Sequence, residues 1–118
     1  MYSNLTDLIQ ETKDTLSHYH YSKEDIDWMG SEDGYIDIDT FWNSAPVLYD
    51  GGYGSVHIPL DFVIVMKDGS VFVRAEYDGS EWWERQYTPV KPDKLCVATK
   101  FVIENWDTDT LGGLNGWY

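Results

Sequence analysis

The first part of the chain repeats its apolar positions with the period of a helix. Within residues 4–20, the positions that recur at intervals of three and four are Leu5, Leu8, Ile9, Thr12 and Leu16. This spacing predicts an amphipathic helix that buries one stripe. Asn4 is the expected N-cap, because short polar side chains satisfy the free N–H groups of a first turn. The opposite side carries Asp7, Glu11 and Asp14, which we expect to form an exposed acidic face.

Three runs rich in β-branched and aromatic residues follow between residues 61 and 88: DFVIVMK, SVFVRAEYD and EWWERQYT. Asp-Gly turn signals join them, which predicts a three-stranded antiparallel meander. A two-residue turn at Asp68-Gly69 would create one wholly apolar face. Its opposed pairs would be Met66–Val71, Ile64–Val73 and Phe62–Ala75. Such a face is expected to lie in the core.

The second Asp-Gly turn decides which face the two adjacent tryptophans occupy. A two-residue loop at residues 78–79 would set Glu84 opposite Val73, inside the expected core. A three-residue loop over residues 78–80, with its glycine in a bulge, avoids this burial of a carboxylate. We therefore expect the longer loop.

With that register, Trp83 lies opposite Ala75 on the core face, beside a small residue that leaves room for the indole. Glu84 lies opposite Arg74 on the outer face, which predicts a cross-strand ion pair. Trp82 shares the outer face. It is either covered by another element or exposed as an anchor for a partner.

The segments outside these elements give mixed signals. Residues 22–26, SKEDI, fit a capping box that starts a helical turn. Residues 34–42, GYIDIDTFW, fit either a strand or a short helix that Pro46 would help to end. Residues 49–55, YDGGYGS, are typical of a loop. Residues 95–106 fit both periods, and we expect a strand added to the sheet.

Length and composition indicate one domain. The 118 residues are 42% hydrophobic and 16% aromatic, enough for a sizeable core. We therefore expect a single α+β domain over residues 1–118, in which the N-terminal helix packs on a small antiparallel sheet centred on the meander. No apolar run approaches the roughly 18 residues of a membrane span, and the first residues lack the features of a secretory signal. We expect a cytoplasmic protein.

Charge changes the picture most. The chain has 21 acidic and eight basic residues, a net charge of −13, and residues 1–50 alone hold eleven acidic residues against two lysines. So acidic a surface repels nucleic-acid phosphates and anionic membranes, and it attracts basic protein surfaces. The alternative is that the acidity only keeps the protein soluble.

Residue patterns typical of catalysis are weak. Asp37 and Asp39 are two residues apart, as Mg²⁺ ligands can be, but no basic residues cluster near them to hold a phosphorylated substrate. Glu81 and Glu84 could be the acid pair of a glycosidase, but an ion pair is expected for Glu84 and a short chain leaves little room for a sugar cleft. We therefore expect no catalytic residue, no metal ligand and no cofactor, and we expect that the protein is not an enzyme.

One further pattern extends over residues 49–89. It combines a Tyr-Asp-x-Gly-Tyr-Gly loop, an apolar strand and the stretch EYDGSEWWE at residues 76–84. In these features the chain resembles small proteins encoded by bacteriophages and prophages of low-GC Gram-positive bacteria. It departs from them in the second strand, where relatives tend to have tryptophans and this chain has Val71 and Phe72. The resemblance implies an origin on a mobile element, and small acidic phage proteins are often inhibitors of host defence enzymes.

Together, these features favour a non-catalytic, anti-CRISPR-like inhibitor that acts in the host cell. It would occupy a basic nucleic-acid-binding cleft of a host protein, such as a CRISPR effector nuclease, with carboxylates where phosphates would lie. It would itself bind neither nucleic acid nor membrane. The expected binding residues are Asp7, Glu11, Asp14, Glu76, Trp82 and Glu84. The alternative is a phage or prophage interaction module whose acidity gives only solubility.

Overall fold

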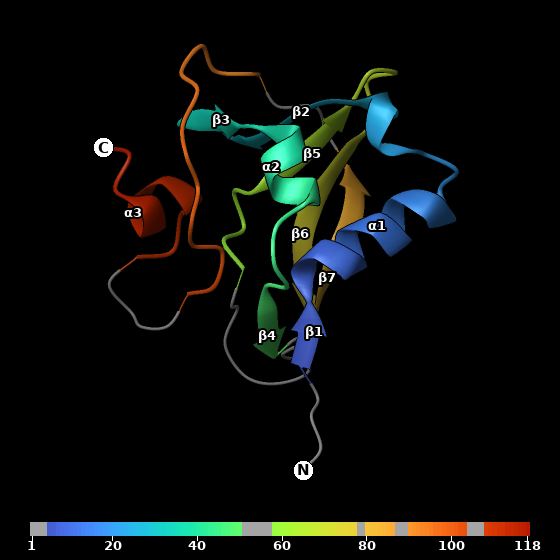
Figure 1. Ribbon diagram of the computed structural model, residues 1–118, viewed down its shortest axis with the longest axis horizontal. Coiled ribbons are helices and arrows are strands. Elements are labelled where there is room, and N and C mark those ends of the chain that lie inside the picture. The colour runs from blue at the N-terminus through green and yellow to red at the C-terminus, as the bar shows by residue number, and fades with distance from the viewer. Residues whose placement is uncertain (1–4, 51–57, 78–79, 87–89, 104–107) are drawn as a thin grey trace.

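The computed structural model describes residues 5–50, 58–77, 80–86, 90–103 and 108–118, and its architecture is α+β (Figure 1). The helices are α1 (Leu8–His18), α2 (Ile38–Trp42) and α3 (Leu111–Asn115), with a 3₁₀ turn, η1, at Lys23–Asp25. The strands are β1 (Leu5–Asp7), β2 (Ile26–Ser31), β3 (Gly34–Ile36), β4 (Leu48–Asp50), β5 (Val63–Met66), β6 (Val71–Tyr77) and β7 (Ser80–Gln86). Among the described residues, no helix is both long and apolar enough to span a bilayer.

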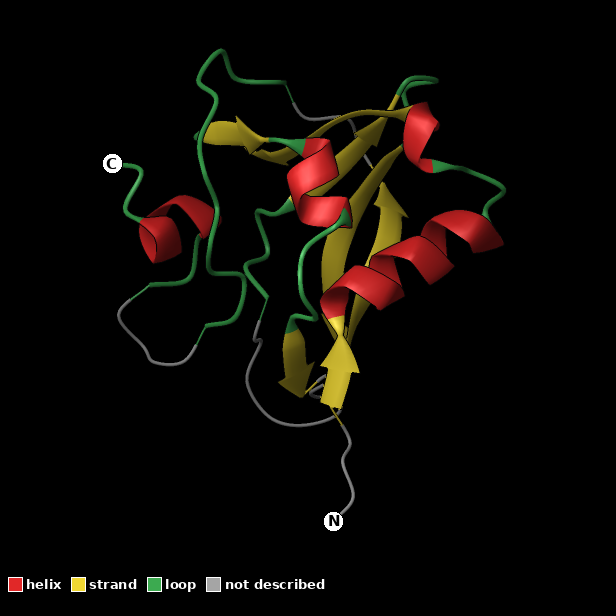
Figure 2. Ribbon diagram, viewed as in Figure 1, coloured by secondary structure: helices red, strands yellow, loops and turns green. Residues whose placement is uncertain are grey.

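The strands build two antiparallel sheets. A five-stranded sheet has the order β3-β2-β5-β6-β7, and β1 pairs separately with β4. In Figure 2, α1 and α2 lie in front of the large sheet and α3 lies beside it. The expected packing of an N-terminal helix on an antiparallel sheet is therefore confirmed, although the sheet has two strands more than the expected meander.

Helix α1 begins later than its sequence pattern suggested. Residues 5–7 pair with β4 as β1, and the carboxylate of Asp7 accepts a hydrogen bond from the N–H of Ile9 at 3.1 Å. Asp7 is thus the N-cap; the expectation of Asn4, which lies outside the described residues, was wrong. The buried stripe is Leu8, Ile9, Thr12 and Leu16, as predicted, without the exposed Leu5 of β1.

The first hairpin has a register one residue away from the expected one. Ile64 lies opposite Phe72 and Val65 opposite Val71, and the loop takes up Lys67 as well as Asp68-Gly69. Gly69 has a φ of 93°, the left-handed conformation that ends a three-residue loop with little strain for glycine. Val71 and Val73 therefore leave the face that packs against α1 and join a second buried cluster with Trp28, Val63 and Val65.

The second hairpin is also one residue off, in the opposite sense. Tyr77 lies opposite Ser80, so the loop is two residues long, and Trp83 lies opposite Arg74 while Glu84 lies opposite Val73. The predicted cross-strand pair of Arg74 and Glu84 is wrong, because alternate side chains point to opposite faces of a strand. Burial of Trp83 is confirmed at 5% exposure. The two-residue loop does not bury Glu84 in the face that packs against α1, because Val73, which lies opposite Glu84, belongs to the second buried cluster.

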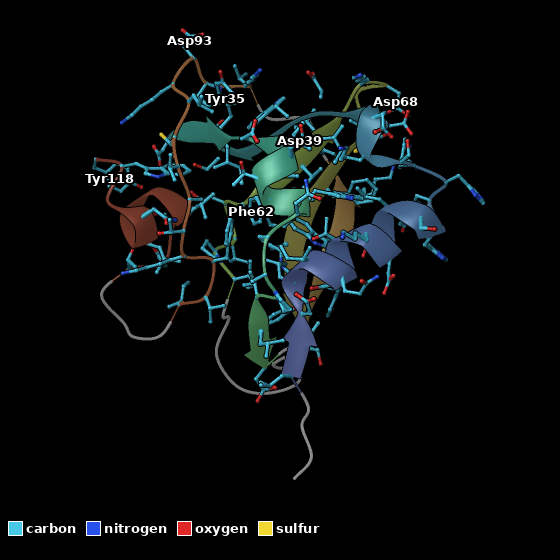
Figure 3. All side chains as sticks on the ribbon, viewed as in Figure 1. Tyr35, Asp39, Phe62, Asp68, Asp93 and Tyr118 are labelled. Carbon is cyan, nitrogen blue, oxygen red and sulfur yellow. The ribbon has the colours of Figure 1, made fainter. Side chains whose placement is uncertain are left out.

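The main core is centred on Phe62, which is labelled in Figure 3. The rings of Phe41, Trp83 and Phe101 surround it with centroid separations of 5.7, 5.3 and 5.3 Å. The contacts of Phe62 with Phe41 and Trp83 are edge-to-face, a geometry that adds to the hydrophobic gain of burying each ring. Through the three rings, α2, β7 and the segment around Phe101 are held on one cluster.

The remaining segments combine the alternatives that the sequence left open. Residues 34–42 form β3 and then α2, which is capped by the carboxylate of Asp37. The capping box before η1 is confirmed. The strand expected over residues 95–106 is wrong in the described part, because only Leu95 pairs, with Tyr35, and residues 96–103 are irregular.

Candidate functional site

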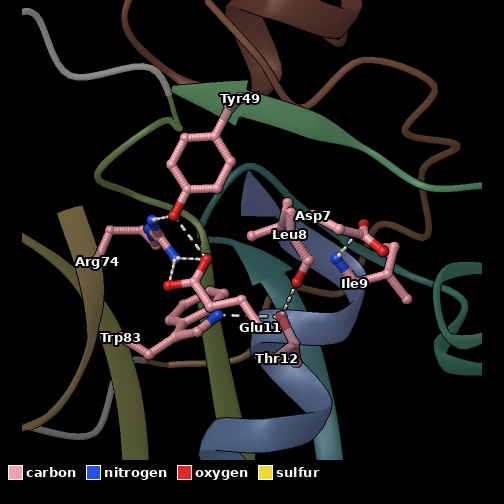
Figure 4. A network of polar contacts seen from close by, with 8 residues as sticks. All are labelled: Asp7, Leu8, Ile9, Glu11, Thr12, Tyr49, Arg74 and Trp83. Atoms are coloured by element: carbon pink, nitrogen blue, oxygen red, sulfur yellow. Dashed lines mark hydrogen bonds and ion pairs between the residues drawn. The ribbon is translucent and has the colours of Figure 1, made fainter. Parts of the chain in front are cut away.

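A buried polar network joins α1, β4 and β6 (Figure 4). The side chain of Arg74 is fully buried, and its Nη1 lies 3.3 Å from both carboxylate oxygens of Glu11. Its Nη2 donates to the Tyr49 hydroxyl at 2.8 Å, and that hydroxyl donates to Glu11 Oε1 at 2.6 Å. The guanidinium also lies over the Trp83 ring, with Cζ 4.8 Å from the centroid.

This network holds the fold together. Burial raises the pKa of Tyr49 well above its usual range, although the charge of Arg74 opposes the rise, so the phenol stays neutral and can donate to Glu11. A buried guanidinium needs a counter-ion and hydrogen-bond acceptors, and Glu11 and Tyr49 supply them from α1 and β4. With its guanidinium out of contact with solvent, Arg74 has a structural role and is not part of a binding surface.

The expected acidic face of the first helix is not a free surface. Asp7 accepts hydrogen bonds from the N–H groups of Ile9 and Val47, at 3.1 and 2.9 Å. Glu11 faces Arg74. Of the three predicted carboxylates, Asp14 is the exposed one, and it accepts a hydrogen bond from the Gln10 side chain. The expectation of an exposed acidic face is therefore wrong for Asp7 and Glu11, whose half-buried carboxylates serve the fold, and a binding role for these residues stays a prediction.

The expected binding residues Trp82 and Glu84, on the second hairpin, lie on the side of the sheet that faces away from α1. Trp83 points to α1, where its Nε1 donates to Thr12 at 3.0 Å, so Trp82 and Glu84 point away from α1. Trp82 is 36% exposed and Glu84 is half-buried. The side chain of Glu76 lies outside the described residues. The structure therefore does not bring the helix residues and the hairpin residues into one site.

A different group of carboxylates lies on η1, the β2–β3 hairpin and the start of α2, at the β3 side of the sheet. Residues 23–39 contain seven acidic residues and one lysine. The exposed ones, which we call the acidic edge, are Glu24, Asp27, Glu32, Asp37 and Asp39. The local density of acidic residues was visible in the sequence. Their common location was not, because it depends on the β2–β3 hairpin that the pattern left undecided.

Four residues of the acidic edge line a groove of about 470 Å³, which we call the acidic groove: Glu24, Asp27, Asp37 and Asp39. The aromatic side chains of Trp28 and Tyr35 also line it, as do three lysines, Lys23, Lys67 and Lys91. Lys23 forms an ion pair with Asp39 at 2.8 Å. The ammonium of Lys91 lies 4.3 Å from the centroid of the Tyr35 ring. The groove thus already holds one cation against an aromatic face.

A second groove, of about 400 Å³, lies next to the first and is mostly apolar. We call it the apolar groove; its lining includes Phe41, Pro46, Val47, Val97, Ala98 and Phe101. Ile36 and Asp37 line both grooves, so the two share a wall. Hydrogen bonds from the hydroxyl and N–H of Thr40 lower the pKa of Asp37, which keeps this shared carboxylate charged.

A further acidic cluster lies where the β2–β3 turn meets α3. Asp61 accepts a hydrogen bond from the N–H of Leu111 at 2.8 Å, and Asp33 accepts one from the Tyr118 hydroxyl at 2.8 Å. Burial raises the pKa of Asp61, and the charges of Asp33 and Asp109 add to the rise. Among the described residues, no group of three or more His, Cys, Asp or Glu side chains is arranged to hold a metal ion.

Comparison with known proteins found no match to a family model, to a curated protein or to a solved structure. The resemblance of residues 49–89 to phage proteins therefore stays a prediction. So do the expected absence of catalysis and the expected basic partner.

Proposed function

We propose that the protein is a non-catalytic inhibitor of phage type, which binds the basic nucleic-acid-binding cleft of a host defence protein. A CRISPR effector nuclease is such a target, and the protein would meet it in the host cytoplasm. The single observation that carries the proposal is the acidic edge, five exposed carboxylates on η1, the β2–β3 hairpin and the start of α2. The expected site on α1 and β7 is replaced by this surface.

The physical basis is electrostatic complementarity. Carboxylates presented along a sheet edge can take the positions of phosphates in a cleft lined by lysine and arginine. A net charge of −13 steers the protein toward such a cleft and raises the rate of encounter. The protein would bind neither nucleic acid nor an anionic membrane, since it repels both. The alternative remains an interaction module whose acidity gives only solubility, and its binding would not depend on the acidic edge.

The test compares two charge-reversal variants with the same net charge. Asp27→Lys combined with Glu32→Lys alters the acidic edge and raises the net charge by four. Both side chains are exposed, so the fold is expected to survive. The matched control, Gln10→Lys with Asp14→Lys and Ser17→Lys, raises the charge equally on the exposed face of α1.

The measurement is capture from a lysate of a low-GC Gram-positive host, followed by association kinetics with the captured protein at low and high salt. Mimicry predicts that the captured protein binds nucleic acid, that nucleic acid competes, and that high salt weakens the complex. The edge variant should associate at least about tenfold more slowly than the control variant. If binding does not change with salt, with competing nucleic acid or in the edge variant, the mimicry proposal fails and the interaction module remains.

A further inference from the structure

We propose that the acidic groove and the apolar groove form one docking site for an extended segment of a basic partner protein. An arginine or lysine side chain of that segment enters the acidic groove, and a neighbouring apolar side chain enters the apolar groove. The inference rests on the proposed function, which calls for a basic partner, and it names the part of the partner that this surface recognises.

The continuity of the two grooves is the first argument. Ile36 and Asp37 belong to both, and the consecutive residues Leu95 and Cys96 line one groove each. Each volume lies within the range of about 300–1,000 Å³ that is usual for binding sites. An extended chain places successive side chains on alternate sides, roughly 3.3 Å apart along its length, so near neighbours can reach two adjoining grooves.

The position of Lys91 supports a cation in the acidic groove. Its ammonium lies over the Tyr35 ring at 4.3 Å, and Asp27 and Asp37 line the same space. This side chain is exposed and is held there by a contact that an incoming cation can replace. A guanidinium fits the groove better than an ammonium does, because it can stack on an aromatic ring while its N–H groups bind carboxylates.

The exposure of apolar residues supports an apolar side chain in the second groove. Val97 is 76% exposed although it lines the groove, and the neighbouring Pro46 is exposed as well. The lining of the apolar groove includes one carboxylate, Asp37, whereas that of the acidic groove includes four, so the acidic groove takes the basic residue. The combination of an apolar surface with a charged rim is typical of a protein-binding site.

The test uses a short fluorescent peptide of alternating arginine and leucine residues, with fluorescence anisotropy to measure Kd. Two further peptides replace all arginines by glutamine or all leucines by serine. Asp27→Asn and Val97→Ser alter one groove each. Their matched controls are Asp14→Asn, at another exposed aspartate, on α1, and Val90→Ser, a valine that is 77% exposed and lines neither groove.

We expect Asp27→Asn and Val97→Ser each to weaken binding of the arginine–leucine peptide by about tenfold, and the controls to change it less than about twofold. Asp27→Asn should have no effect on the glutamine peptide, and Val97→Ser none on the serine peptide. Equal effects of site and control variants, in proteins with unchanged melting temperatures, would overturn the docking site.

The same variants separate the two proposals. If the site variants weaken peptide binding but leave salt-dependent capture of the target unchanged, the target does not use these grooves. That result would overturn the docking site and leave the proposed function. The opposite result is also informative. If the peptides bind with the expected pattern but target binding does not change with salt or competing nucleic acid, the docking site is supported and the mimicry is overturned.

Discussion

Arg74 and Trp83 lie directly opposite each other on β6 and β7, with the guanidinium stacked over the indole. The contact places a permanent charge in the main core, between an aromatic face and the carboxylate of Glu11. It also explains why an arginine is tolerated in a strand whose neighbours are apolar. The ring supplies a polarisable surface, and α1 supplies the counter-ion.

Trp83 is the first residue whose change should reveal this arrangement. Trp83→Ala removes a buried ring, its contact with Phe62 and its hydrogen bond to Thr12, so the free energy of unfolding should fall by about 3–5 kcal/mol. Trp82→Ala, at the more exposed neighbour, should cost much less. Denaturant unfolding of both variants is the measurement, and similar losses would place Trp82 in the core as well.

Glu11 and Asp14 form a matched pair on one helix. Glu11→Lys sets a second positive charge beside the buried Arg74 and should destabilise the protein by about 3–5 kcal/mol. Asp14→Lys, on the exposed side of the same helix, should change stability by no more than about 0.5 kcal/mol. Thermal unfolding distinguishes them. Changing Asp7, Glu11 and Asp14 together would therefore damage the fold, so that variant cannot test binding.

Asp7 links the start of α1 to the segment before β4. Asp7→Ala removes the acceptor for the N–H groups of Ile9 and Val47, and should cost about 1–2 kcal/mol. Asp7→Asn keeps an acceptor oxygen at the cap and should recover most of that loss. If the alanine and asparagine variants were equally stable, capping by this side chain would not matter.

Asp61 should make stability depend on pH. Because its pKa is raised above the ordinary value of 3.8 in the folded protein, its contribution is fully present below that value and is lost as pH rises through the raised pKa. An asparagine side chain cannot ionise, so Asp61→Asn should raise the melting temperature at neutral pH. The gain should shrink toward about pH 3, where the wild-type carboxyl is protonated. Asp93→Asn, at an exposed aspartate, controls for the loss of one charge, and a gain that persists in acid would contradict the assignment.

The sequence predicted the elements better than their registers. The buried stripe of α1 and the burial of Trp83 follow from local patterns of apolar residues. Each Asp-Gly turn is compatible with loops of two or three residues, and a slip of one residue exchanges the two faces of a strand. The position of Val73 was used to choose the second loop, so the error in the first hairpin led to the error in the second.

The candidate site was harder to predict, for a related reason. Glu11 and Arg74 are 63 residues apart in the chain, and no local pattern connects them. The exposed carboxylates of the acidic edge were visible as a dense acidic stretch. Their grooves, however, depend on Leu95 and Cys96, which reach β3 from a distant part of the chain.

The pairing of Leu95 with β3 has a consequence for the order of folding. Tyr35 and Leu95 pair although sixty residues separate them, and the N–H of Cys96 donates to the Tyr35 carbonyl at 2.7 Å. β7 and Leu95 lie at opposite ends of the strand order. Contacts between residues so far apart form slowly, because a long loop must close first. We therefore expect the wall that completes both grooves to form only after the local β2–β3 hairpin, and the amide of Cys96 would report its arrival by hydrogen exchange.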